Sequence, residues 1–322
     1  MESTTVTVAR NRRLGGIDPL ILGLLIALLV LVAFIGVQKP TVFFHPKNLL
    51  NIGQAITLIG LVALAQTVVI IMGGLDLSVG SVVGLVSIFT ALAMRDNDNL
   101  VLGITIGLGV GLAAGLVNGL LITKGGLEPV IATLGTLAVY RGAAFMLTNG
   151  APIGIMNDVF NKIGSGRGLG IPVPVIILVV VMVVYHIFLT MTRYGRNVYI
   201  IGGNAVAARL SGININSYKL AIYGLCGFTA ALAGLVLTAR SNAGQPNSGT
   251  GLELESITAA VLGGTVLSGG RGTVLGTMLG VLILGVLNNG MILLGVNQFY
   301  QFVAKGALLI LAVLIQRWLA RG

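Results

Sequence analysis

The chain has 322 residues, of which 56% are hydrophobic and 9% are charged, and its formal net charge is +10 at pH 7. This composition excludes an ordinary soluble domain and indicates a polytopic membrane protein. The 19 lysines and arginines lie at the ends of apolar runs and form no continuous stripe, so they indicate orientation in a membrane and argue against nucleic-acid binding.

Ten apolar segments are candidates for membrane-spanning helices, since about 20 mainly apolar residues are needed to cross a bilayer. In chain order they are 18–37, 49–72, 78–94, 100–123, 129–148, 173–191, 218–239, 253–268, 273–294 and 299–317. The eighth segment is the weakest because it is short and begins with Glu253 and Glu255, so a partial or re-entrant helix is the alternative there. We expect one all-α polytopic membrane domain over residues 1–322. Its first segment is expected to stay as an anchor, because no small-residue cleavage site follows it.

The basic residues predict which ends of these helices lie in the cytoplasm. An even number of spans places both termini on one side, and the excess of basic residues assigns that side to the cytoplasm. The basic residues on that side are Arg10, Arg12, Arg13, Lys124, Arg193, Arg196, Arg209, Lys219, Arg271, Arg317 and Arg321. Those on the other side are Lys39, Lys47, Arg95, Lys162, Arg167 and Arg240. The count of 11 inside against 6 outside favours this orientation.

A glycine-bounded break, residues 73–81, separates the second and third spans and contains Asp76. Aspartate is a preferred N-cap and its charge suits the start of a helix, so Asp76 is expected to cap the third span. The alternative is that Asp76 lines or gates a path through the membrane, because ionisable residues in apolar segments are costly and often functional. Glu128, Arg141 and Lys305 also lie in or beside apolar segments, and their sequence context does not decide between pairing and exposure to water.

The fourth span carries a regular row of glycines. They recur every four residues, at Gly103, Gly107, Gly111, Gly115 and Gly119. This spacing places them on one helical face, where a neighbouring helix can pack almost backbone to backbone. We expect a packing role, and the alternative is a seam along which helices slide or tilt during a transport cycle.

The longest polar loop, residues 192–217, has the features of a partner-binding surface. An Ala-rich stretch from Asn204 to Leu210 is long enough for two helical turns, with Asn204 as the N-cap and Gly212 as the terminator. Small side chains allow close approach by another protein. The flanking basic residues place this loop, and therefore the partner, in the cytoplasm.

The two halves of the chain contain similar glycine- and asparagine-bearing stretches, at 111–122 and 280–292. On the predicted topology the first runs inward and the second outward. The stretches therefore predict inverted repeats over 49–148 and 218–317, an arrangement typical of transporters. A chance resemblance between two glycine-rich helices is the alternative.

Motifs for chemistry are scarce. The sequence has no phosphate-binding loop and no zinc-protease motif, and its only histidines are His45 and His186. We therefore expect no catalytic residue, no metal site and no cofactor in this chain. The single cysteine, Cys226, lies in an apolar run, which excludes an internal disulfide and favours a packing role.

Four segments together resemble the ribose-type permeases of bacterial ATP-binding-cassette sugar importers. They are 74–81, 202–213, 244–254 and 262–277, they stand in the family's order, and the resemblance extends over about residues 48–315. It implies a permease subunit of the inner membrane that pairs with a second copy to form a pore. It also implies that a periplasmic binding protein delivers a small sugar, such as a ribose-like pentose, and that a separate cytoplasmic ATPase carries the ATP and Mg.

The resemblance also implies roles for individual residues. The segment around 204–212 would be the coupling helix seated in the ATPase, with contacts from Asn204, Ala207, Ala208, Arg209, Leu210, Ser211 and Gly212. Val206 stands where the broader importer signature has a glutamate, so the contact made by that glutamate is in doubt. The glycine-rich turn 269–272 would make a second ATPase contact, or it is only a tight turn.

The remaining candidates concern the path and the outer surface. Asp76, Ser78, Asn118 and Asn289 are candidates for lining or gating the path. Arg95, Arg167 and Arg240, in the outer loops 95–99, 149–172 and 240–252, are candidates for docking the binding protein, with plain solvated loops as the alternative. Two other functional classes stay open. One is an ion-coupled secondary transporter of a small polar solute, and the other, a membrane scaffold or receptor, fits poorly with the break at Asp76.

Overall fold

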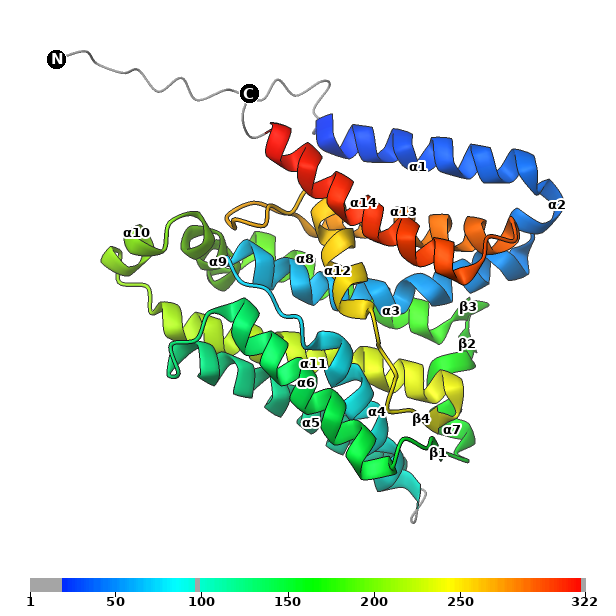
Figure 1. Cartoon of the computed structure of the whole chain (residues 1–322), viewed down its shortest axis with the longest axis horizontal. Coiled ribbons are helices and arrows are strands. Elements are labelled where there is room, and N and C mark those ends of the chain that lie inside the picture. Colours follow the sequence, from blue (N-terminus) through cyan, green and yellow to red (C-terminus); the bar gives the residue numbers. More distant parts are fainter. Residues whose placement is uncertain (1–18, 96–98, 320–322) are drawn as a thin grey trace.

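Figure 1 shows the computed structural model of the chain, which describes residues 19–95 and 99–319. The helices are α1 (Pro19–Gln38), α2 (Pro40–Phe43), α3 (Pro46–Ile71), α4 (Val79–Arg95), α5 (Leu100–Thr123), α6 (Pro129–Thr148), α7 (Asp158–Ser165), α8 (Val173–Met191), α9 (Arg193–Gly203), α10 (Ala205–Leu210), α11 (Ile215–Ser241), α12 (Leu252–Leu262), α13 (Val274–Leu293) and α14 (Gln298–Leu319). The strands are β1 (Ile153–Gly154), β2 (Arg167–Gly168), β3 (Ile171–Pro172) and β4 (Ala243–Gly244). The expected all-α polytopic fold is confirmed.

Eight helices of the described chain are long and apolar enough to cross a membrane, namely α1, α3, α5, α6, α8, α11, α13 and α14. The third predicted span, 78–94, forms α4, an apolar helix of 17 residues that begins at Val79 after the extended break. The eighth contains α12, whose 11 residues end at Leu262, so its length is about 16 Å, roughly half of a bilayer core. The expectation of a full helix over 253–268 is therefore wrong, and the partial-helix alternative is correct.

The cause of this early end is local. The Gly263 N–H bonds back to the Ala259 carbonyl, and Gly264 follows with a φ of +90°. That left-handed conformation is readily accessible only to glycine and stops the helix. Non-helical segments also precede both short helices, at 72–78 before α4 and at 245–251 before α12. We call each short helix together with the irregular segment before it an interrupted crossing.

The helices run between two ends of the molecule (Figure 1). One end, here the α10 end, carries α9, α10, the start of α1 and the end of α14, and the opposite α7 end carries α2, α7 and the strands. Arg193, Arg196, Arg209 and Arg317, which were predicted to be cytoplasmic, belong to elements of the α10 end, and Lys162 and Arg167, which were predicted to be outside, belong to elements of the α7 end. The orientation of the two ends in the membrane stays a prediction. Arg10, Arg12, Arg13 and Arg321 lie outside the described residues.

The helix packing has a paired pattern. In the first part of the chain α4 packs between α5 and α6, and in the last part α12 packs between α13 and α14. Across the two parts, α11 packs on α4 and α5, while α3 packs on α12 and α13. Inverted repeats over 49–148 and 218–317 would require this exchange of partners, and the repeat stays a prediction.

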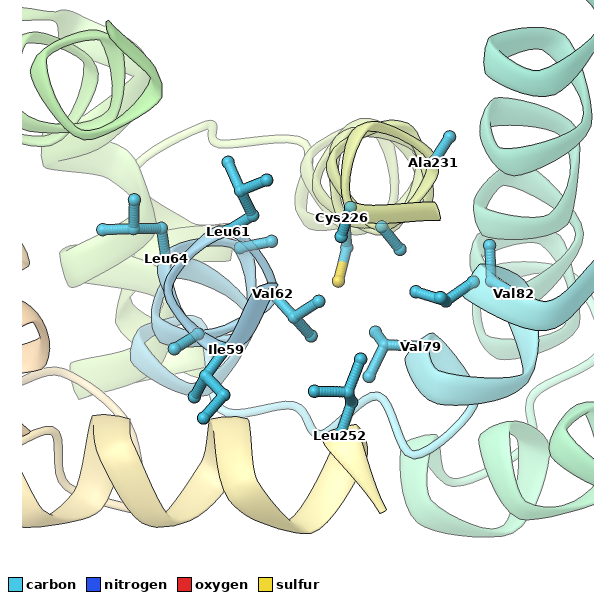
Figure 2. Packing of buried hydrophobic residues seen from close by; sticks show 14 of the residues in the cluster. Ile59, Leu61, Val62, Leu64, Val79, Val82, Cys226, Ala231 and Leu252 are labelled. Atoms are coloured by element: carbon cyan, nitrogen blue, oxygen red, sulfur yellow. The ribbon is translucent and has the colours of Figure 1, made fainter. Parts of the chain in front are cut away.

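The core lies where α3, α4, α11 and α12 meet. Figure 2 shows Cys226 of α11 pointing toward Val62 of α3, with Val79 at the start of α4 and Leu252 at the start of α12 close by. Cys226 is a free and buried cysteine, which confirms its packing role.

The predicted glycine row of α5 is also a packing surface. A Cβ on Gly111 would lie 2.6 Å from the carbonyl oxygen of Gly227 in α11. One on Gly107 would lie 2.9 Å from the side chain of Leu235 in the same helix. The small residues therefore allow α5 and α11 to pack at close range.

Two small antiparallel pairs close the α7 end. β1 pairs with β4, so that Ile153 opposes Gly244 and the two longest of the loops predicted to be outside are joined. β2 pairs with β3 in a hairpin between α7 and α8. These pairs supply the backbone hydrogen bonds that irregular segments outside the helices would otherwise lack.

Candidate functional site

A fully buried polar network surrounds the break between α3 and α4. Asp76 is 1% exposed, and its Oδ1 accepts hydrogen bonds from the backbone N–H (2.9 Å) and the hydroxyl (2.6 Å) of Ser78. Asn118 of α5 donates from Nδ2 to Ser78 Oγ at 2.8 Å, and Thr136 of α6 donates to Asn118 Oδ1 at 2.7 Å. We call these four residues the Asp76 network. It joins the break to two neighbouring helices and places a carboxyl group beside Ser78, the residue before α4, and the capping role of Asp76 stays a prediction.

The backbone of this break is satisfied by side chains. The hydroxyls of Thr133 in α6 and Tyr223 in α11 both donate to the carbonyl oxygen of Leu75, each at 3.3 Å. Irregular backbone at membrane depth is tolerated only where protein groups or water satisfy it. The sequence contained a signal for part of this arrangement, because Thr133, Thr136 and Tyr140 recur at helical spacing and form a polar stripe on α6.

The second break, before α12, is held by Arg141 of α6. Its Nη1 donates to the carbonyl oxygens of Pro246 (2.8 Å) and Ser248 (2.7 Å). The two breaks lie against each other, because Gly80 of α4 is approached closely by Glu253 and by the carbonyl oxygen of Gly249. Two short helices therefore begin side by side, and discontinuous helices of this kind form the solute and ion sites of many transporters.

The predicted partner-binding segment forms α10. Asn204 caps it, since its Oδ1 accepts from the backbone N–H of Ala207 at 3.0 Å, and Gly212 follows the helix with a φ of +80°. Both local predictions are confirmed. Ala208 is fully buried against the protein, whereas Val206 is 70% exposed and Leu210 is 85% exposed. Ala207, Arg209 and Ser211 are exposed as well. An apolar surface with one cation is thus presented at the α10 end.

The end of α9, directly before α10, contacts the connection after α3 and the connection after α12. Gly270, in the turn after α12, donates its N–H to the carbonyl oxygen of Ile71, the last residue of α3, at 2.8 Å. Gly202 of α9 fits against both, because a Cβ there would overlap the Ile71 oxygen and lie 2.7 Å from the Gly270 nitrogen. We call the contact of Ile71, Gly202 and Gly270 the glycine joint. The hydrogen-bonded turn of this connection spans Val266 to Gly269, and the predicted segment 269–272 follows it with positive φ at three glycines.

Tyr199 adds a second link at the same place. Its hydroxyl donates to the carbonyl oxygen of Gly272 at 2.8 Å. Burial raises the pKa of Tyr199 above its usual value, so the hydroxyl keeps its proton and stays a donor. α9 is thereby attached to the connection between α12 and α13.

The other predicted residues lie apart from these sites. Asn289 of α13 exchanges two side-chain hydrogen bonds with Asn48 of α3, at 2.8 and 3.1 Å, and does not join the Asp76 network. Lys305 pairs with Glu255 at 2.7 Å, so pairing, and not exposure to water alone, is the arrangement at this position. Arg95, Arg167 and Arg240 are exposed; Arg167 lies in β2 at the α7 end, and the other two lie in the last turns of α4 and α11.

Comparison with known proteins decides the family. The family model described as the branched-chain amino acid transport system permease component matches residues 48–313. The chain belongs to this permease family. The ribose import permease protein RbsC of Bacillus subtilis (strain 168) is 46% identical to the permease over 298 residues, 92% of each chain. RbsC of Escherichia coli (strain K12) is 43% identical over 295 residues, 90% of the permease and 92% of RbsC.

A third relative is named for a different sugar. The L-arabinose ABC transporter permease protein AraH of Azospirillum brasilense is 37% identical over 318 residues, 98% of the permease and 94% of AraH. No solved structure matches the permease. The resemblance to ribose-type permeases is confirmed, and neither a secondary transporter nor a scaffold is favoured.

Proposed function

We propose that the permease is the membrane-spanning subunit of an ATP-binding-cassette importer for a small sugar, with a pentose such as ribose or arabinose as the cargo. It would lie in the bacterial inner membrane with both termini in the cytoplasm. The relatives named for ribose and arabinose support the sugar class. The observation that carries the proposal is the glycine joint, which connects the exposed α10 segment to the ends of both interrupted crossings.

The energy source would be a separate ATPase that receives α10 in a surface cleft. The exposed Val206 and Leu210 offer apolar contact, and Arg209 offers a charge. ATP and Mg would be bound on that subunit, since the sequence of the permease has no phosphate-binding loop. Val206 replaces a glutamate of the broader signature, so this contact would rest more on apolar burial than on an ion pair.

The opposite end would receive the sugar-loaded binding protein. The strand pair β1–β4 holds the two long outer loops together and gives a defined surface. Exposed Arg95, Arg167 and Arg240 would guide carboxylates of the binding protein to it, because rim charges act mainly on the rate and register of docking. A second copy of the permease would complete the pore.

Transport would follow from movement at the glycine joint. ATP binding closes the ATPase pair, and α10 moves with it. α9 then displaces the end of α3 and the turn after α12, which lead into the two breaks. The path opens to one side and then to the other, as rigid elements rock about the breaks.

Reversal of the charge at Arg209 tests the coupling. We expect Arg209→Glu to fold normally and to abolish ATP-driven uptake in proteoliposomes that contain the ATPase and binding protein, because the side chain is exposed and is proposed to contact the ATPase. Lys124→Glu is the matched control, since Lys124 is an exposed basic residue at the end of α5, outside the coupling segment. Undiminished uptake by Arg209→Glu would contradict the assignment. Uptake that stops with an uncoupler while ATP is held constant would favour an ion-coupled transporter.

A further inference from the structure

The two interrupted crossings carry related sequences at their breaks. Gly74-Leu-Asp-Leu-Ser78 precedes α4, and Gly251-Leu-Glu-Leu-Glu255 opens α12. The helices beside them match as well, because Gly115-Leu-Val-Asn118 of α5 corresponds to Gly285-Val-Leu-Asn288 of α13.

Each half has one further matching position, which is the eighth residue of the next helix along the chain. Thr136 holds this position in α6 and Lys305 holds it in α14. Ser78, Asn118 and Thr136 of the Asp76 network therefore have counterparts in the second half, in the order Glu255, Asn288 and Lys305.

Glu255, Asn288 and Lys305 line a pocket, whereas Ser78, Asn118 and Thr136 form direct hydrogen bonds with one another. Lys305 Nζ lies 2.7 Å from Glu255 Oε1, and the two side chains are 24% and 23% exposed. A pocket of about 220 Å³ is lined by this pair, by Asn288, and by apolar groups that include Phe302. A second recess of about 340 Å³ shares Asn288, Phe302 and Lys305 with it and extends to Gln298 and Gln301 at the start of α14.

One polar atom in this pocket has no partner. Among the described residues, Asn288 Oδ1 is buried and makes no hydrogen bond, whereas its counterpart Asn118 uses its amide oxygen to accept from Thr136. A buried amide oxygen without a partner is unfavourable, because it has lost its hydrogen bonds to water. A ligand that donates a hydrogen bond there would remove this cost.

We propose that the pocket between α12, α13 and α14 is a solute site of the permease for a neutral polyhydroxylated ligand. The proposal rests on the proposed function and locates the sugar within this chain. Glu255 and Asn288 Oδ1 accept from hydroxyls, Lys305 donates to them, and each sugar hydroxyl can do both. The ion pair contributes no net charge, which suits a neutral solute.

The walls and the position of the pocket agree with this ligand. Phe302 is 61% exposed and offers a flat apolar face beside the polar groups, the combination that small-ligand pockets use. α13 ends and α14 begins at the α7 end of the molecule (Figure 1), so the recess at Gln298 and Gln301 leads toward the end proposed to receive the binding protein.

Cysteine labelling tests the site without relying on transport. In a Cys226→Ala background, Asn288→Cys is treated with a polar, membrane-impermeant methanethiosulfonate in the assembled complex. We expect labelling that slows about tenfold in the presence of whichever of D-ribose or L-arabinose the wild-type complex imports, since a bound sugar excludes the reagent. Met156→Cys, 97% exposed in an outer loop, should label at the same rate with and without sugar. Absence of labelling at position 288, or labelling that the sugar does not slow, would overturn the proposal.

Uptake separates this proposal from the proposed function. Lys305→Met should reduce sugar uptake by about tenfold, the value of one lost charged hydrogen bond, while ATP hydrolysis by the assembled complex persists. Lys305→Arg keeps a donor and a positive charge and should restore part of the uptake. Full uptake by Lys305→Met would overturn the solute site and leave the importer function intact. Absence of ATP-driven uptake of either sugar by the wild-type complex would overturn the importer proposal, and the sugar assignment with it.

Discussion

The interrupted crossing at α4 and the one at α12 use corresponding positions in opposite ways. Around α4 the side chains of Asp76, Ser78, Asn118 and Thr136 are buried and joined by short hydrogen bonds. Around α12 an ion pair lines a pocket. A polar group at membrane depth therefore does not by itself identify a binding site. What separates the two cases is whether the polar groups satisfy one another.

Side-chain length accounts for much of the difference. The Asp76 network is built from short side chains, so α5 and α6 approach the break closely enough for direct hydrogen bonds. Glu255 and Lys305 are long and flexible, and their contact spans the distance from α12 to α14 while leaving space beside it. The first arrangement is suited to hold a break in position, and the second is suited to receive another molecule.

Removal of the Asp76 carboxyl group should have the largest effect on stability. Asp76→Ala would leave the N–H and hydroxyl of Ser78 without their acceptor and would remove the longer contact from Asn118, which keeps Ser78 Oγ, at a cost of about 3 kcal/mol. The thermal unfolding midpoint in detergent measures this loss. Asp76→Asn keeps an acceptor oxygen and should be milder. Equal midpoints for wild type and Asp76→Ala would show that the network does not hold the break.

The sequence was sufficient for features that depend on neighbouring residues. The long apolar helices, the cap at Asn204, the end at Gly212 and the packing face of α5 all follow from local composition and spacing. The end of α12 at Leu262 was harder to predict. The apolar sequence continues beyond the helix, and the position of the helix end depends on the backbone conformation of the glycines that follow it.

Partners distant in the sequence were not predictable in this way. Arg141 was recognised as an unusual cation, but its acceptors lie 105 and 107 residues away on the main chain. Lys305 and Glu255 are 50 residues apart. Asn289 was named as a path residue, yet the neighbouring Asn288 faces the pocket. One position along a helix turns a side chain by about 100°, so the choice between adjacent asparagines requires the packed structure.

The glycine joint links both crossings to α9, and a small substitution there should have the next largest effect. Gly202→Ala places a methyl group against the backbone of Ile71 and Gly270, which should cost about 2 kcal/mol and reduce coupled uptake. Gly203→Ala is the matched control, because no atom lies within 4 Å of the added methyl group. Thermal unfolding and ATP-driven uptake should separate the two variants. Similar behaviour of both would contradict the role of the joint.

Arg141 reaches from α6 to the segment before α12 and so joins the two crossings directly. Arg141→Lys keeps the charge but loses the planar guanidinium that reaches both carbonyl oxygens, so we expect a loss of about 1 kcal/mol. Arg196→Lys, at an exposed position of α9, is the control and should not change the unfolding midpoint. A midpoint for Arg141→Lys equal to that of wild type would place the support of this segment elsewhere.

The smallest loss of stability is expected where the α12 pocket is altered. Glu255 lies in a partly exposed ion pair, and such pairs contribute less than about 1 kcal/mol. Glu255→Ala should therefore unfold close to the wild-type temperature, while Asp76→Ala at the other break unfolds far below it. When uptake is measured per folded complex, Glu255→Ala should lose more uptake than Asp76→Ala, because it removes a group proposed to bind the solute. A Glu255→Ala variant that unfolds as early as Asp76→Ala would mean that both breaks need their polar groups for structure, and the distinction between a closed network and an open pocket would fail.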